Sequence, residues 1–161
     1  MRIEAATRKR EAKELLPPDG KATATSLEKL AAPLLPAQNR LRLFIADDSQ
    51  LILDNLSALL QLVPGIQIVG TAQTTKAAIQ GIQRLTPDLV ILDFQLSDGN
   101  GLDVLKVIKH QDTGPTVIMF TNHVYPPYRE HCTQWGADHF FDKSQDVERV
   151  VETCQQLLSL K

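Results

Sequence analysis

The sequence predicts an α/β protein in which a parallel sheet of five strands is covered by helices on both faces, a three-layer sandwich. Five short apolar runs alternate with five amphipathic segments between Leu41 and Leu160, and the linkers between them are short. Such alternation requires parallel strands joined by right-handed crossovers. Residues 89–92, Leu-Val-Ile-Leu, support this, because four branched apolar residues in a row are typical of a strand buried on both faces.

The apolar periodicity and the turn residues place each element along the chain. The predicted strands are 41–46, 66–70, 89–92, 116–120 and 138–141. The predicted helices are about 50–62, 75–85, 101–109, 126–135 and 147–160. Predicted N-caps are Ser49 for the first helix, Thr74 or Thr75 for the second, and Ser144 or Asp146 for the last. The first helix is expected to turn an apolar face inward, made of Leu51, Ile52, Leu56, Leu59 and Leu60.

Composition bounds the function. The chain has 161 residues, is 43% hydrophobic and carries a formal net charge of -2, so it offers no electrostatic case for direct nucleic-acid binding. Cys132 and Cys154 stand far apart without zinc-ligand spacing and are expected to be reduced thiols of a cytoplasmic protein rather than a disulfide. The sequence shows neither a signal peptide nor an apolar run of the roughly 20 residues that would insert into a membrane.

Residues 1–40 differ from the rest and are predicted to be a flexible, partly helical N-terminal extension. They hold eight Lys/Arg and five Asp/Glu, whereas residues 41–161 hold nine and fourteen. The segment 2–16 favours a short helix with a thin apolar stripe, which is marginal in water on its own, and Pro17-Pro18 ends it. A tail without a fixed structure and an arm that docks on a partner or on the domain both fit this pattern.

Polar residues follow the strands at their carboxyl ends, and they carry the predicted chemistry. The first strand is followed by Asp47 and Asp48, and the third by Asp93; an Asp at the end of one strand is by itself an ordinary solvated residue. In a parallel sheet these ends open on one side, where ligands bind. Carboxylates gathered there repel each other, and Mg²⁺ relieves this because it prefers carboxylate oxygens and water. An Asp in such a site can attack phosphorus and form an acyl phosphate.

Four motifs in order resemble the receiver domain of bacterial two-component response regulators over residues 41–161. They are Asp47-Asp48, Asp93 with the loop Asp98-Gly99-Asn100-Gly101-Leu102, Thr121, and the segment 136–143, Gly-Ala-Asp-His-Phe-Phe-Asp-Lys. The resemblance implies a flavodoxin-like (βα)5 fold with strand order 2-1-3-4-5. It also implies a phosphorelay in which a phosphoprotein is formed on Asp93.

The same resemblance assigns the other site residues. Asp48 and Asp93 would ligate Mg²⁺, Asp47 would do so directly or through water, and Gln95 would contribute its backbone carbonyl. Thr121 and Lys143 would hold the phosphoryl group. Phe140 matches the switch aromatic, although ordinary core packing also explains it.

Several positions depart from the family pattern. Ser144 follows the lysine, where many members have Pro in a cis peptide, so that loop is expected to be arranged differently. Ser97 stands where many members have Pro, and Asn122 stands where many have a small residue, which narrows access to the phosphoryl group. His123 and His139 lie near the mouth of the site by sequence and are expected to be partly exposed polar residues rather than a second nucleophile.

These observations predict a stand-alone, single-domain response regulator without an output domain. It would take a phosphoryl group from a sensor histidine kinase or a histidine phosphotransfer protein and signal to a downstream protein target; homodimer formation is left open. One alternative is a receiver-like interaction module that is not phosphorylated. Another is a phosphatase with an aspartyl nucleophile, but that class needs an acid at position 95, where the chain has Gln95. The prediction is therefore a non-enzyme.

Overall fold

The computed structural model describes residues 40–110 and 114–161, so the predicted N-terminal extension lies outside the described residues. Their main sheet has five parallel strands in the order β2-β1-β3-β6-β7. This is the predicted order 2-1-3-4-5, because the labels β4 and β5 belong to a separate two-stranded hairpin. The main strands are β1 (Leu41–Ala46), β2 (Ile66–Ala72), β3 (Leu89–Leu92), β6 (Thr116–Thr121) and β7 (His139–Asp142).

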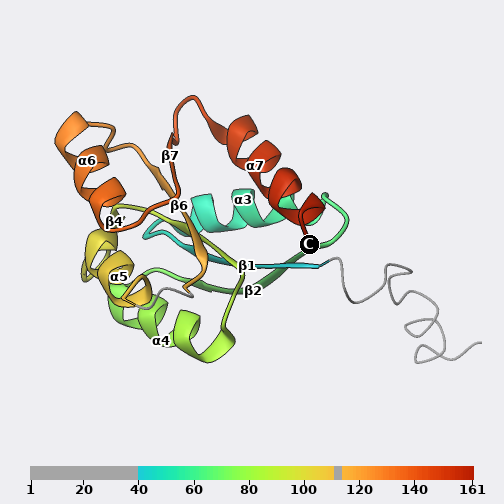
Figure 1. Cartoon of the computed structure of the whole chain (residues 1–161), viewed down its shortest axis with the longest axis horizontal. Coiled ribbons are helices and arrows are strands. Elements are labelled where there is room, and N and C mark those ends of the chain that lie inside the picture. The colour runs from blue at the N-terminus through green and yellow to red at the C-terminus, as the bar shows by residue number, and fades with distance from the viewer. Residues whose placement is uncertain (1–39, 111–113) are drawn as a thin grey trace, which may run out of the picture. The chain divides into compact units, whose positions relative to one another are not determined.

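In the described residues, one helix follows each main strand, five in all, and these helices cover both faces of the sheet (Figure 1). They are α3 (Gln50–Gln61), α4 (Thr75–Leu85), α5 (Gly101–Ile108), α6 (Pro126–Gln134) and α7 (Val147–Ser159). Helices α3 and α7 share one apolar cluster with the sheet, and α4, α5 and α6 share the other. The three-layer α/β prediction is confirmed.

Strand β3 is buried on both faces, as its unbroken apolar sequence predicts. Leu89 and Ile91 belong to the cluster under α3 and α7, while Val90 and Leu92 belong to the opposite cluster. All four side chains are at most 1% exposed. The central strand therefore holds Asp93, the residue that follows it, in a fixed position at the edge of the core.

The predicted ends of elements are right to within about two residues, and the differences have local causes. Strand β2 runs to Ala72 because its last residues continue to pair with β1. Strand β7 is shifted by one residue, since Asp142 pairs with Thr121 while the carboxylate of Asp138 accepts a hydrogen bond from the Val117 N–H. Residues 95–100, for which no strand was predicted, form the hairpin of β4 (Gln95–Leu96) and β5 (Gly99–Asn100).

The caps of the first two helices are confirmed, but the inward face of α3 was predicted partly wrongly. Ser49 and Thr74 each accept a hydrogen bond from a backbone N–H in the first turn of the following helix. In α3 the buried residues are Leu53, Leu56 and Leu60, whereas Leu51 is 67% and Leu59 37% exposed. The stripe 53, 56, 60 keeps the helical period, and Leu51 lies outside it.

Candidate functional site

The acidic residues after β1 and β3 meet at the carboxyl edge of the sheet. Ala46 and Leu92, the last residues of these neighbouring strands, are paired in register, and the N–H of Asp93 donates to the carbonyl of Ala46 at 2.8 Å. One carboxylate oxygen each from Asp47, Asp48 and Asp93 lies within 4.8 Å of the others. The convergence expected from the parallel sheet is therefore observed.

Lys143 brings a positive charge into this group from the end of β7. Its Nζ lies 2.5 Å from Oδ2 of Asp47 and 2.6 Å from Oδ2 of Asp93. The side chains of all three residues are at most 7% exposed. A buried charge without a partner is costly, so this shared ammonium compensates two carboxylates that water hardly reaches.

The three carboxylates of the site are matched by the single ammonium of Lys143, so the balance of charge favours a further cation. Burial raises the pKa of Asp47, and the hydrogen bond from Lys143 and the N–H of Ser49 oppose that rise. Oδ1 of Asp93 is buried and has no hydrogen-bond partner among the described residues. A carboxylate oxygen without a donor, close to two further carboxylates, fits a hard divalent cation such as Mg²⁺.

Thr121 and Gln95 lie at the same edge. Thr121 ends β6, is fully buried, and accepts a hydrogen bond from the N–H of His123 at 3.1 Å. Nε2 of His123 lies 3.0 Å from Oε1 of Gln95. His123 is exposed, as the sequence predicts, but its bond to Gln95 was not predicted; a bond between residues 28 positions apart has no sequence signal.

Phe140 is partly buried against the cluster under α4, α5 and α6. Arg129 of α6 covers it, with the guanidinium carbon 5.3 Å from the ring centroid and a hydrogen bond of 3.2 Å to the Phe140 carbonyl. His139, its neighbour, lies against the ring of Phe141. The packing role of Phe140 is thus visible, and its role as a switch stays a prediction.

The loop after Asp93 is fixed to the start of α4. The carboxylate of Asp98 accepts hydrogen bonds from the N–H groups of Thr75 and Lys76, and the first of these lowers the pKa of Asp98. The N–H of Ser97 donates to the carbonyl of Gln73 at 3.0 Å. These contacts hold the hairpin β4–β5, which begins two residues after the candidate phosphoacceptor.

The connection from β7 to α7 was predicted incorrectly in one respect. Asp146 occupies the N-cap position of α7 but makes no side-chain cap hydrogen bond, and Ser144 does not cap the helix either. The Asp146 carboxylate instead accepts from the N–H of Asp142, which lowers the pKa of Asp146. Ser144 binds the carboxylate of Asp142. The bond from the Ser144 N–H to the Asp142 carboxylate makes an Asx-type turn around Lys143. An Asp two residues before a Ser is a sequence signal for such a turn.

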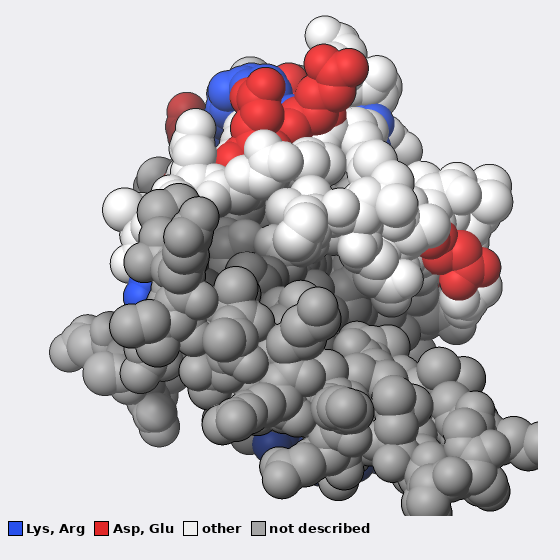
Figure 2. Space-filling model, turned by 90° about the vertical axis from the view of Figure 1, so that its right-hand side faces the viewer, with Lys and Arg blue, Asp and Glu red and all other residues white. Residues whose placement is uncertain are grey.

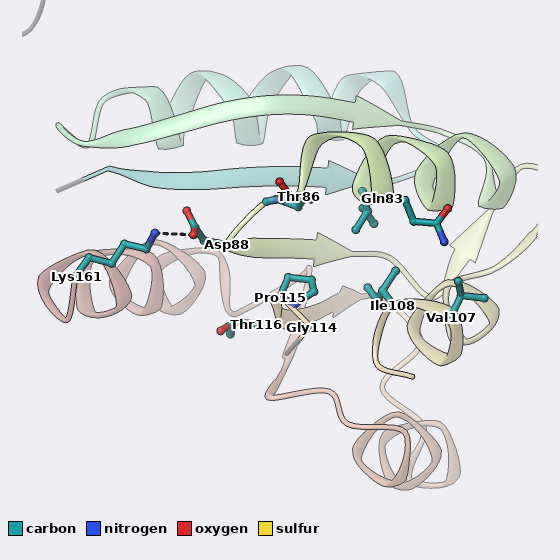
Figure 3. A pocket seen from close by; sticks show the side chains of 11 residues that line it. Gln83, Thr86, Asp88, Val107, Ile108, Gly114, Pro115, Thr116 and Lys161 are labelled. Carbon is teal, nitrogen blue, oxygen red and sulfur yellow. Dashed lines mark ion pairs between the residues drawn. The ribbon is translucent and has the colours of Figure 1, made fainter. Parts of the chain in front are cut away.

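A pocket lies at the amino-terminal edge of the sheet, opposite to the acidic site. This cavity of about 530 Å³ is lined by residues that include Thr86, Asp88 and Pro115, and the ion pair of Asp88 with Lys161, 2.6 Å long, borders it (Figure 3). Asp88 precedes β3, whereas Asp93 follows it. The cavity therefore belongs to the other end of the strands and takes no part in the acidic site.

On the side that Figure 2 presents, the charged side chains of described residues lie mainly at the top of the view. Acidic and basic side chains lie next to each other there, and uncharged residues separate them from a further acidic group. Among the described residues, none of the helices has the length and apolar content that crossing a membrane requires.

Fold and site together define a doubly wound α/β protein with a buried acidic cluster and a lysine at the carboxyl edge of its sheet. The model of the response regulator receiver domain matches residues 43–155. The chain belongs to this family, a part of two-component signal transduction, and the resemblance inferred from the motifs is confirmed.

Individual relatives agree with this assignment. The sensory transduction protein LytT of Bacillus cereus is 30% identical over 116 residues, which are 72% of this chain and 46% of LytT. A protein-glutamate methylesterase/protein-glutamine glutaminase of Treponema denticola is 26% identical over 73% of this chain and 34% of its own length. The receiver domain of NarL from Mycobacterium tuberculosis superimposes with a TM-score of 0.69 at 22% identity, covering 76% of this chain and 98% of that one, and shows the shared fold.

The chain spans less than half of the length of LytT and about a third of that of the methylesterase. The similarity therefore concerns the receiver domain that these relatives share. Some relatives of this domain are enzymes by name, and others are signalling regulators.

Proposed function

We propose that this protein accepts a phosphoryl group on Asp93 and passes the signal on through protein–protein contacts. The observation that carries the proposal is the position of Lys143, whose ammonium lies between Asp47 and Asp93, while Oδ1 of Asp93 has no hydrogen-bond partner in the described part of the chain. A carboxylate beside a fixed cation and further carboxylates suits attack on a phosphoryl group, whose oxygens need positive charge around them.

In the proposed reaction the donor is a phosphohistidine of a sensor histidine kinase or of a histidine phosphotransfer protein. A carboxylate oxygen of Asp93 forms a bond to phosphorus, the P–N bond breaks, and the imidazole leaves with the electron pair and takes up a proton. Lys143 would then pair with a phosphoryl oxygen, and the hydroxyl of Thr121 would donate to another. These residues position and neutralise the group that is transferred.

The proposed Mg²⁺ ligands are the carboxylates of Asp48, Asp93 and Asp47 and the backbone carbonyl of Gln95. When bound, Mg²⁺ would neutralise charge on the phosphoryl oxygens. Two observations support this assignment: the carboxylate oxygens lie within 4.8 Å of one another, and Oδ1 of Asp93 accepts no hydrogen bond from any described residue.

The proposed output is a population shift between two conformations that involve Thr121 and Phe140, read by a downstream protein target. We also propose that the protein acts in the cytoplasm and does not turn over an external substrate. The two unpaired, buried cysteines fit a reducing compartment. Action without an output domain stays a prediction, and homodimer formation and the role of residues 1–40 stay open.

A small phosphodonor such as acetyl phosphate tests the proposal. With Mg²⁺, intact-mass spectrometry of the full chain should show the addition of one phosphoryl group, and chelation with EDTA should prevent it. Asp93→Asn should stay unmodified, and Asp103→Asn, which changes an exposed Asp of α5, is the matched control that should react like the wild type. Unchanged mass of the wild type, or equal modification of Asp93→Asn, would defeat the proposal.

A receiver-like module that binds partners without phosphorylation is the second candidate. The ion pairs of Lys143 are compatible with it, because they offset part of the negative charge of Asp47 and Asp93 without any added cation. Isothermal titration separates the two candidates. Heat of Mg²⁺ binding at millimolar concentration, lost in Asp48→Asn, supports the phosphorylated receiver, and absence of binding in the wild type supports the module.

A further inference from the structure

The short connection between β7 and α7 is closed by its own hydrogen bonds. Oδ1 of Asp142 accepts from the N–H of Ser144 at 2.8 Å and from its hydroxyl at 2.6 Å. The N–H of Asp142 donates to Oδ2 of Asp146 at 3.0 Å, and the N–H of Asp146 donates to the carbonyl of Asp142 at 2.8 Å. Residues 142–146 therefore form a compact turn, tied at both ends.

Lys143 is the residue that this turn encloses. Its own N–H donates to the carbonyl of Thr121 at 3.1 Å, and its side chain enters the acidic site. The peptide bonds between described residues are all trans. Lys143 and Ser144 are therefore joined by a trans bond, whereas the family pattern has a cis Lys–Pro bond at this position. In this chain the hydrogen bonds between Asp142 and Ser144 fix the backbone beside Lys143.

A lysine needs this support more than a rigid side chain would. Its four-carbon stem has many rotamers, and holding the ammonium between two carboxylates costs conformational entropy. Fixing the backbone on both sides of Lys143 limits the positions that Nζ can reach, so that the ion pairs with Asp47 and Asp93 are retained. A misplacement of about 1 Å at a reacting centre can lower a rate by roughly 100-fold.

We propose that Asp142 and Ser144 are positioning residues for phosphoryl acceptance at Asp93, and that they act through Lys143. This inference rests on the proposed function. The hydrogen bonds of the two side chains go to each other and to the turn. They set where the Lys143 ammonium stands without touching the reacting carboxylate.

Four variants of the full chain test the inference with acetyl phosphate and Mg²⁺. Asp142→Ala removes the acceptor of both bonds and should lower the maximal phosphorylation rate about tenfold, as loss of an outer-shell partner typically does. Ser144→Ala removes one bond and should lower it about threefold, and Ser144→Thr should restore it. Ser159→Ala is the matched control, because that exposed hydroxyl donates to the Gln156 carbonyl far along α7, and it should react like the wild type.

The kinetic pattern distinguishes positioning from general destabilisation. The maximal rate should fall more than the half-saturating donor concentration rises, and thermal melts should show each variant folded at the assay temperature. In a Lys143→Ala background, Asp142→Ala should cause no further loss, since the residue through which it acts is gone.

Three results would overturn the inference. These are an unchanged rate in both Asp142→Ala and Ser144→Ala, a tenfold loss that persists in the Lys143→Ala background, or failure of Ser144→Thr to restore the rate. A wild type that is not phosphorylated at all would instead defeat the proposed function, so the two failures can be told apart.

Discussion

Gly101, the first residue of α5, is the position where adding a single methyl group should disturb the site most. A Cβ built there would lie 2.0 Å from the backbone carbonyl oxygen of Asp93 and 3.2 Å from Cγ of Leu92. Real Cβ contacts stay beyond 3.0 Å, so the two backbone segments would have to separate by at least about 1 Å. The obstacle is backbone, and the N–H of Gly101 is also bound to the carbonyl of Phe94 at 2.7 Å.

Gly101→Ala is therefore expected to lower the free energy of unfolding by about 1–3 kcal/mol, the usual cost of overpacking a fixed core. The same displacement moves Asp93 relative to Lys143, and we expect phosphorylation by acetyl phosphate to slow at least tenfold. Urea unfolding followed by circular dichroism measures the first effect, and intact-mass kinetics measures the second.

Gly99→Ala is the matched control in the same loop. Its Cβ would meet Oγ1 of Thr75 at 2.8 Å, the end of a side chain that can turn away. We expect a loss of stability below about 1 kcal/mol. If Gly101→Ala were as stable and as quickly phosphorylated as the wild type, the claim that this close approach fixes Asp93 would be wrong.

Three further predictions concern the rest of the domain. Burial raises the pKa of the Cys132 thiol to about 11 and that of Cys154 to about 12, so iodoacetamide at pH 8 should leave both unmodified in the folded protein and label both in urea. The hydrogen bond from the Thr75 N–H holds the pKa of the Asp98 carboxyl below its ordinary 3.8 in the folded protein. The stability that this carboxylate contributes is therefore present above pH 3.8 and is lost as the pH falls through the folded pKa. In Asp98→Asn, the free energy of unfolding measured with urea should fall less steeply over this acid range. Gly81→Ala in α4 would bring a Cβ to 2.7 Å from the ring of Phe44, so we expect about 1 kcal/mol or more of destabilisation in urea, partly restored by Phe44→Leu.

Each of these predictions has an outcome that contradicts it. Rapid labelling of either folded thiol would show that the core opens more readily than its burial implies. Equal loss of stability in the wild type and in Asp98→Asn as the pH falls below 3.8 would contradict the carboxylate's role at the start of α4. A Gly81→Ala protein as stable as the wild type would mean that the ring adapts without cost.

Much of the fold was predictable because it follows from local chemistry. The apolar run 89–92 could only be a strand buried on both faces, and Ser49 and Thr74 cap their helices through bonds to residues three positions away. The strand order was implied by the family resemblance, and the meeting of Asp47 with Asp93 followed from the geometry of parallel sheets. The inward face of α3 was harder, because that helix is apolar around more of its circumference than the sheet can cover, and Leu51 is left exposed.

The sequence by itself determined which residue types stand at the ends of the strands, and therefore the kind of chemistry that the carboxyl edge can support. Only the tertiary structure decided how Lys143 stands between Asp47 and Asp93, and that Ser144 donates to the Asp142 carboxylate instead of capping α7. The physical reason is range. Periodicity and caps act over a few residues, whereas the 50 positions between Lys143 and Asp93 are bridged only when the whole sheet assembles and burial forces each charge to find a partner.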